Sequence, residues 1–130
     1  MTNEPEERTA RYAVRFSAQA DRDITTALLR LAEITGEAAA LTWRNLLLTE
    51  AGTLAETPRR FAVDEQVSRR LQQETRRMLF RPSPTGAGYH IYYVIHEESP
   101  DGPRVMVLHV RHAARRPITR EEARQIVANI

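Results

Sequence analysis

Residues 89–112 read YHIYYVIHEESPDGPRVMVLHVRH, and this segment predicts a β-hairpin. Residues 89–96 are dense in β-branched and aromatic side chains, which is the composition of a central strand. The Pro-Asp-Gly sequence that follows predicts a turn, and residues 104–111 resume the strand pattern. We therefore expect these two strands to pair with each other.

Two more strands are predicted upstream of this hairpin. Residues 12–16 alternate apolar and polar side chains, as a strand with one buried face does. Residues 76–81 are the second candidate, and a loop rich in proline and glycine follows them. In the segment 59–75 the pattern is weaker: residues 61–63 fit a short extended piece, and residues 67–71 fit one face of a helix.

A helical hairpin is predicted after the first strand. Ser17 suits an N-cap, and apolar residues recur at helical spacing over residues 24–34, up to Gly36. A second helix is expected over residues 37–56, ended by Pro58. Two helices joined by one glycine turn predict an antiparallel pair.

The carboxyl-terminal residues predict one more helix. Thr119 and Glu122 have the spacing of a capping box, and the apolar residues between Ala123 and Ile130 form one stripe. The order of elements predicts an α+β fold: an N-terminal strand, an antiparallel helical hairpin packed on a mostly antiparallel sheet of about four strands, and an extra C-terminal helix.

Length and composition exclude several classes of protein. A chain of 130 residues fits one domain, expected over residues 12–117, with a flexible N-terminus over 1–11 and a C-terminal helix extension over 118–130. The chain has no cysteine, which excludes disulfides and thiolate metal sites. No apolar run is long enough to span a membrane, and the acidic N-terminus is unlike a secretory signal, so a cytoplasmic location is expected.

Positive charge is concentrated in two blocks. All 19 basic residues are arginine, because the sequence contains no lysine. Residues 57–81 hold seven arginines and three acidic residues, and residues 104–120 hold five arginines and no acidic residue. Such blocks on a chain of net charge +2 predict one basic face, and the planar guanidinium group suits carboxylates, phosphates and aromatic faces.

Strict alternation divides the side chains of the last strand between two faces. The face that it predicts as core consists of Met106, Leu108 and Val110. The opposite face, which turns from apolar to basic, consists of Val105, Val107, His109 and Arg111. If the strands are neighbours, Arg15 and either Tyr92 or Tyr93 join His109 and Arg111 on the sheet face away from the helices.

Histidine, arginine and tyrosine gathered on one surface suit work on a phosphodiester. An RNA 2′-hydroxyl needs a base, and the negative charge that develops needs a fixed guanidinium. Because arginine stays protonated, that base would be His109, His112 or His90. The simpler alternative is that His109 only caps a strand edge by binding a backbone group, since His-Arg clusters are common on basic surfaces. A metal site built from the four histidines is disfavoured, because the chain has no cysteine and the histidines lie on or just after predicted strands, not on one face of a helix.

Several ordered motifs resemble the ParE/RelE superfamily of bacterial toxins. Residues 12–24, YAVRFSAQADRDI, and the helical hairpin up to Pro58 resemble the start of that family. Residues 89–93, YHIYY, and residues 105–116, VMVLHVRHAARR, are similar to its paired final strands and closing His-x-x-Arg element. The resemblance covers about residues 12–117. The segments 59–75 and 118–130 depart from the family pattern.

The resemblance implies the toxin of a type II toxin–antitoxin module, wrapped by an acidic and apolar segment of a cognate antitoxin protein. RelE-like members cut mRNA on the ribosome, whereas ParE-like members poison DNA gyrase by binding it. The long helical hairpin and the closing element favour the ParE-like branch, so growth inhibition through gyrase binding is the expected function. A RelE-like ribosome-dependent mRNA endoribonuclease is the alternative, and a degenerate, non-toxic member that only binds its antitoxin is the second alternative.

These readings give two sets of candidate residues. For a metal-independent ribonuclease, the catalytic candidates are His109, Arg111, His112, Tyr93 and Arg81. For binding of the target or antitoxin, the candidates are Arg15, Arg76, Arg77, Arg111, Arg115 and Arg116. Arg111 and Arg115 are expected to be exposed, and the C-terminal helix is expected to cover the sheet or to join a dimer. A homodimer or a toxin–antitoxin hetero-oligomer is expected, with no cofactor, metal or membrane.

Overall fold

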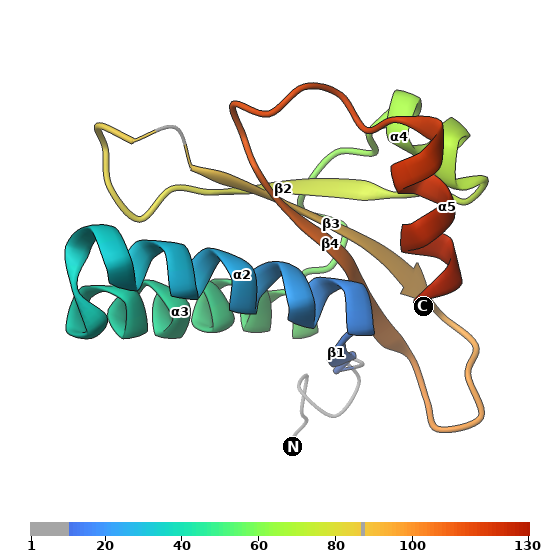
Figure 1. The fold of residues 1–130 in the computed structure, drawn as a ribbon. Coiled ribbons are helices and arrows are strands. Elements are labelled where there is room, and N and C mark those ends of the chain that lie inside the picture. Colours follow the sequence, from blue (N-terminus) through green and yellow to red (C-terminus); the bar gives the residue numbers. More distant parts are fainter. Residues whose placement is uncertain (1–10, 87) are drawn as a thin grey trace, which may run out of the picture.

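The computed structural model describes residues 11–86 and 88–130, so that all but the last residue of the expected flexible N-terminus lies outside the described residues. Figure 1 shows the helices and strands in their order along the chain. They are β1 (Ala13–Phe16), α2 (Ala18–Thr35), α3 (Glu37–Gly52), the short 3-10 helix η1 (Thr53–Ala55), α4 (Glu65–Leu71), β2 (Arg76–Phe80), β3 (Tyr89–His96), β4 (Arg104–His112) and α5 (Arg120–Ala128). The predicted α+β class is confirmed.

The four strands form one mixed sheet in the order β1-β4-β3-β2. β3 pairs antiparallel with both β2 and β4, which confirms the expected hairpin, whereas β1 joins the other edge of β4 in parallel. β1 is short and pairs only with residues 104–107 of β4. The remainder of that edge of β4 is therefore left for groups from other elements.

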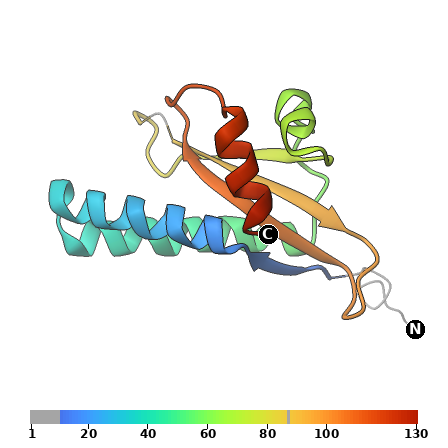
Figure 2. The ribbon, with the colours of Figure 1, turned by 45° about the vertical axis from the view of Figure 1, so that its right-hand side comes forward.

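The helices α2 and α3 form the predicted antiparallel hairpin and cover one face of the sheet (Figures 1 and 2). The Ser17 hydroxyl caps α2 by accepting a hydrogen bond from the Ala20 backbone N–H at 3.1 Å. Gly36 makes the turn between the helices with a φ of 95°, a conformation that a residue with a Cβ rarely adopts. The hairpin is thereby fixed at both ends of α2.

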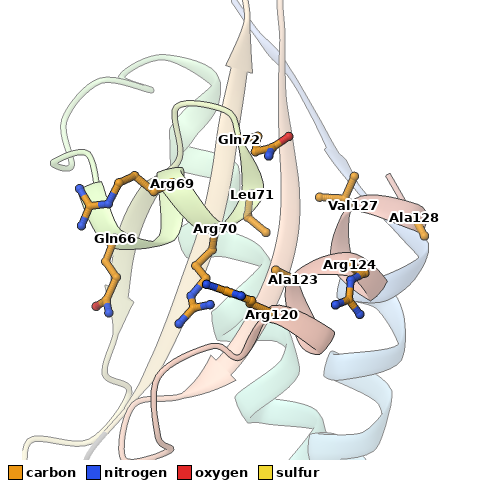
Figure 3. A pocket seen from close by; sticks show the side chains of 10 residues that line it. All are labelled: Gln66, Arg69, Arg70, Leu71, Gln72, Arg120, Ala123, Arg124, Val127 and Ala128. Atoms are coloured by element: carbon orange, nitrogen blue, oxygen red, sulfur yellow. The ribbon is translucent and has the colours of Figure 1, made fainter.

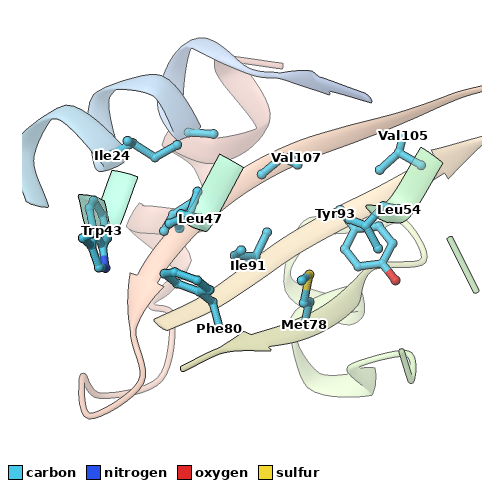
Figure 4. Packing of buried hydrophobic residues seen from close by; sticks show 12 residues of the cluster. Ile24, Trp43, Leu47, Leu54, Met78, Phe80, Ile91, Tyr93, Val105 and Val107 are labelled. Carbon is cyan, nitrogen blue, oxygen red and sulfur yellow. The ribbon is translucent and has the colours of Figure 1, made fainter. Parts of the chain in front are cut away.

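An apolar core fills the space between this hairpin and the sheet (Figure 4). Trp43 and Leu47 of α3 meet Ile91 of β3 and Val107 of β4, and none of the four is more than 7% exposed. The Trp43 ring lies tilted against Tyr89, with 5.1 Å between ring centroids. Burial of such side chains stabilises the fold by about 1.5–3 kcal/mol each.

The opposite face of the sheet is covered by α4 and α5 (Figure 2). α5 begins with the predicted capping box: the Thr119 hydroxyl accepts from the Glu122 N–H at 3.1 Å, and the Glu122 carboxylate accepts from the Thr119 N–H at 2.9 Å. Ile126 of α5 belongs to a second buried cluster with Tyr92 and Leu108 of the sheet. The C-terminal helix thus covers the sheet, one of its two expected roles.

A β-bulge interrupts the pairing of β3 with β4. Tyr93 of β3 lies opposite Val107 of β4, and Tyr92, the residue before Tyr93, lies opposite His109. Leu108 therefore has no opposite residue in β3, and the alternation of side chains along β4 is reversed from that point.

The bulge overturns the expected division of β4 into two faces. Val110 joins Val105 and Val107 in the core under the helical hairpin. His109 and Arg111 instead lie on the face covered by α5, where Met106 and Leu108 also pack. The predictions that Val110 shares a face with Leu108, and that Val107 shares one with His109, are wrong.

The weakly patterned segment 59–75 contains the two expected pieces. Val63 forms an isolated antiparallel bridge with Arg76, and Val67 and Leu71 are the buried residues of α4. The Asp64 side chain caps α4 by accepting from the Val67 N–H at 3.0 Å. This segment places α4 beside α5, where both helices line the same side of the sheet.

Candidate functional site

Two rows of side chains cross the sheet on the face that α4 and α5 cover. The first row runs through Arg77 of β2, Tyr92 of β3 and His109 of β4. The second row runs through Leu79, His90 and Arg111 on the same strands. Opposite residues in such rows are close enough to interact. The Tyr92 and His109 rings stack with centroids 6.0 Å apart, and the Tyr92 hydroxyl lies 3.5 Å from His90 Nδ1.

Arg111 is held inside the protein rather than at its surface. The residue is 3% exposed. Its Nε and Nη2 atoms donate to the Arg116 carbonyl at 3.2 and 2.7 Å, and its two Nη atoms each lie 3.3 Å from a Glu122 carboxylate oxygen. The expected exposure of Arg111 is wrong, because the loop before α5 folds back over the end of β4 and supplies acceptors to the guanidinium.

The Glu122 carboxylate joins three arginines to the start of α5. Besides Arg111, it accepts from Arg115 at 3.1 Å, and the Arg116 guanidinium lies at 3.9 Å. Burial alone would raise the pKa of the Glu122 carboxyl, but hydrogen bonds from the Thr119 backbone and the Arg111 guanidinium outweigh it and hold the pKa at about 2. Glu122 is therefore an anion throughout the physiological range.

His109 extends this arrangement to the other edge of β4. Its Nδ1 lies 2.7 Å from the Asp23 carboxylate of α2, and its Nε2 lies 3.3 Å from Arg111 Nη1. The same Asp23 oxygen accepts from the Val110 N–H at 3.0 Å, on the edge that β1 leaves unpaired. The strand edge is thus capped by the Asp23 carboxylate, which His109 binds. We call Asp23, His109, Arg111 and Glu122 the buried charge network.

A pocket of about 160 Å³ opens beside this network. His90 and Tyr92 of β3 line it, as does the Asp64 carboxylate, which pairs with Arg77 at 3.3 Å. The arginines that line it are Arg70, Arg77, Arg111, Arg115 and Arg116. The pocket is accordingly a basic cavity suited to an anion.

Two ring side chains in the pocket have shifted pKa values. Burial lowers the pKa of His90, and the charges of Arg77 and Arg111 lower it further against the opposing effect of Asp64. Burial raises the pKa of Tyr92, as does Asp64. At neutral pH the pocket therefore offers an uncharged imidazole and an uncharged phenol among its guanidinium groups.

The structure brings only some of the predicted site residues together. Arg77, Arg111, His112, Arg115 and Arg116 all line the pocket. His112 is exposed at its rim, where the ring packs against Tyr89 with centroids 5.1 Å apart. His109 adjoins the pocket but is enclosed by its partners in the buried charge network.

The other candidates lie elsewhere. Tyr93 is fully buried under the helical hairpin, and its hydroxyl donates to the Pro58 carbonyl at 2.6 Å. Arg76 donates to the Phe61 carbonyl at 2.6 Å. Arg81, in the loop after β2, donates to the Pro84 carbonyl at 3.0 Å. Arg15 is exposed on β1, and the expected meeting of Arg15 with His109 and Arg111 does not occur among its hydrogen bonds.

Four of the groups that build the site carry no functional signal in the sequence. Asp23 and Glu122 complete the buried charge network, and Asp64 and Arg70 line the pocket. The capping-box spacing identified Glu122 as a helix start, but nothing in the sequence links it to Arg111. Asp23 carried no signal beyond its place near the start of a helix, because its partner on β4 is 87 residues away.

Comparison with known proteins leaves the family open. No protein-family model matches the chain, and no curated protein matches it. Across residues 11–86 and 88–130, no helix is both long and apolar enough to cross a membrane. In the same part of the chain, no group of three or more His, Asp or Glu side chains is placed to hold a metal ion.

Proposed function

We propose that this protein is the toxin of a bacterial type II toxin–antitoxin module and that it acts by binding a protein target. The resemblance to the ParE-like branch of the ParE/RelE superfamily names DNA gyrase as that target. The order of elements, a strand and a helical hairpin before a three-strand antiparallel unit, agrees with this resemblance. The proposal also accounts for the basic surface, because an antitoxin with an acidic segment needs one.

One observation favours binding over RNA cleavage: the strongest catalytic candidates are engaged inside the protein. The His109 side chain is 7% exposed, with Asp23 on one ring nitrogen and Arg111 on the other. Tyr93 is buried on the wrong face of the sheet. A general base must come within hydrogen-bond reach of the hydroxyl that it deprotonates. His109 does not meet that condition in this conformation, and Tyr93 does not reach the face of the sheet that carries the pocket.

The exposed part of the basic surface lies just after β4. The Arg115 and Arg116 side chains are 47% and 63% exposed, and they flank Glu122 without being enclosed by it. Arginine is favoured at protein interfaces because its fork binds carboxylates with two hydrogen bonds. We assign the main target contact to this pair.

The ribonuclease alternative is favoured by a different observation, the grouping of Arg77, His90 and Tyr92 in the pocket. His90 is neutral at pH 7 because its pKa is lowered, so it can accept a proton there. Arg77 and Arg111 would stabilise negative charge on a phosphate. In this reading His90, and not His109, is the base.

Inducible expression in growing bacteria separates the two functions. We expect growth to stop, with a DNA-damage response and intact mRNA. The double variant Arg115→Ala with Arg116→Ala should relieve the growth arrest, and His90→Ala should leave it unchanged. Arg30→Ala with Arg44→Ala, exposed on the helical hairpin, is the matched charge control. Cleavage of mRNA within reading frames that disappears in His90→Ala would establish the ribonuclease instead, and unimpaired growth with the unmodified protein would contradict toxicity.

A further inference from the structure

A groove separates α4 from α5 on the side of the molecule away from the helical hairpin (Figure 3). Its volume is about 920 Å³, several times that of the pocket beside the buried charge network. Gln66 and Arg70 of α4 line both cavities. The groove therefore adjoins the candidate site, although none of the predicted site residues lines it.

The groove has basic sides and an apolar floor. Its sides carry Arg69 and Arg70 from α4, and Arg120 and Arg124 from α5. Arg70 and Arg120 point into the same gap between the two helices (Figure 3). No aspartate or glutamate is among the ten residues that line the groove. Arg124 is already paired with Glu121 at 2.6 Å. The guanidinium groups of Arg69, Arg70 and Arg120 repel one another, and an anionic occupant would relieve that repulsion.

The floor and the exposed edge of the groove are hydrocarbon. They are formed by Leu71 of α4 together with Ala123 and Val127 of α5, and Val127 is 43% exposed although it lies beside a buried core. A groove between two helices with an apolar floor fits the apolar face of a third helix, whose charged flanks then meet the rims. Acidic flanks would match these rims.

The same lining disfavours a nucleic acid. Recognition of single-stranded RNA or DNA relies on aromatic side chains that stack on the bases. None of the ten lining residues is aromatic. Phosphates could pair with the arginines, but the floor of Leu71, Ala123 and Val127 would gain nothing from the bases' polar edges.

We propose that the groove between α4 and α5 binds an acidic amphipathic helical segment of a protein partner. The apolar face of this segment lies on Leu71, Ala123 and Val127, and its carboxylates pair with Arg69, Arg70 and Arg120. This inference goes beyond the proposed function, because it concerns a surface that the toxic activity does not use. The binding is measured without any growth assay, so the two proposals can fail separately.

Fluorescence anisotropy with the full chain tests this inference. The probe is a fluorescein-labelled peptide of about 18 residues in which leucine recurs every third or fourth position and the other positions are glutamate or glutamine. We expect saturable binding. The double variant Arg70→Glu with Arg120→Glu should weaken it by about tenfold or more, since each change replaces an attraction by a repulsion. Val127→Asp should weaken binding as well, because it places a negative charge on the apolar floor of the groove.

Matched controls give each result a meaning. Arg30→Glu with Arg44→Glu makes the same change of net charge on the helical hairpin and should alter binding less than twofold. A peptide with its leucines replaced by serine should bind about tenfold more weakly if the floor contributes. The circular dichroism of every variant shows whether its fold is intact.

Three outcomes would overturn the inference. The peptide could fail to bind, it could bind equally to both charge-reversed variants, or a single-stranded RNA of equal charge could bind more tightly through Arg70 and Arg120. The last result would assign the groove to a nucleic acid. If the peptide binds as expected but expression of the protein leaves growth unimpaired, the proposed role of the groove is supported and only the proposed toxicity is contradicted.

Discussion

Replacing Glu122 by glutamine tests the buried charge network directly. The change keeps the size of the side chain but leaves the Arg111 guanidinium, which is 3% exposed, without a counter-ion. Breaking a fully buried ion pair costs about 3–5 kcal/mol. Here the Arg116 carbonyl still accepts two hydrogen bonds from Arg111, and the Glu122 side chain is 23% exposed. We therefore expect the free energy of unfolding to fall by about 2–3 kcal/mol at pH 7.

The pH dependence gives the same test a second readout. The pKa of Glu122 is about 2 in the folded protein, against an ordinary value of 4.5. Its ionisation therefore stabilises the fold fully above about pH 5, and this contribution is lost as the pH falls through about 2. The full pKa shift corresponds to about 3 kcal/mol. Because Arg115 and Arg116 are exposed, water screens their attraction to Glu122, and we expect the stabilisation to be about 2 kcal/mol. The difference between the unmodified protein and Glu122→Gln should shrink by more than half between about pH 7 and pH 3.

Urea unfolding followed by fluorescence provides the measurement, because the chain has a single tryptophan, Trp43, buried under the helical hairpin. Glu121→Gln is the matched control: this residue is 70% exposed on the same turn of α5 and pairs with the equally exposed Arg124. We expect it to change the free energy of unfolding by less than about 0.5 kcal/mol. Equal stabilities of the unmodified protein and Glu122→Gln at pH 7, or a difference that does not shrink on acidification, would refute this reasoning.

Three further substitutions test the packing and the edge of the sheet. Leu108→Ala, at a fully buried position on the α5 side, should lower the free energy of unfolding by about 2–5 kcal/mol in the same urea assay. Gly88→Ala should lower the melting temperature, since φ is 86° and a Cβ would lie 2.6 Å from a backbone oxygen, while Gly86→Ala, with open space around it, should not; equal melting temperatures would contradict this. Asp23→Asn should cost about 1–3 kcal/mol and speed hydrogen exchange at the Val110 amide, and unchanged exchange would show that the carboxylate does not cap the strand.

Much of the fold follows from local patterns along the sequence. Capping residues mark the starts of α2 and α5, the glycine at 36 separates α2 from α3, and residues 89–96 form β3 with the expected bounds. Each of these features depends on neighbours a few residues apart. The parallel pairing of β1 with β4 and the covering of the sheet by α5 depend instead on distant contacts, so the order of elements alone did not require them.

The candidate site was harder to predict, because one residue of the bulge changes the result for all those after it. Alternation correctly placed Arg111 and Val110 on different faces of the sheet, but it could not reveal that Leu108 has no partner in β3. The pairing of Arg111 with Glu122 spans a turn, a loop and a helix start. An arginine is usually exposed, so the sequence predicted an exposed Arg111. Arg111 is buried because α5 places Glu122 against its guanidinium, which the sequence alone does not show.

Strand β4 contributes side chains to both buried clusters, one on each face of the sheet, and the bulge at Leu108 decides which residues enter which cluster. Deleting one residue near position 108 would exchange the faces of the residues that follow it in β4. The Arg111 guanidinium would then enter the apolar core under the helical hairpin, and Val110 would lie among the charged groups beside α5. Such a shift disrupts both buried clusters at once, whereas a change in length within residues 97–103, which connect β3 to β4, leaves both clusters intact. Proteins that descend from a common ancestor with this fold should therefore vary in the length of that connection and keep the spacing from Val105 to Arg111 constant.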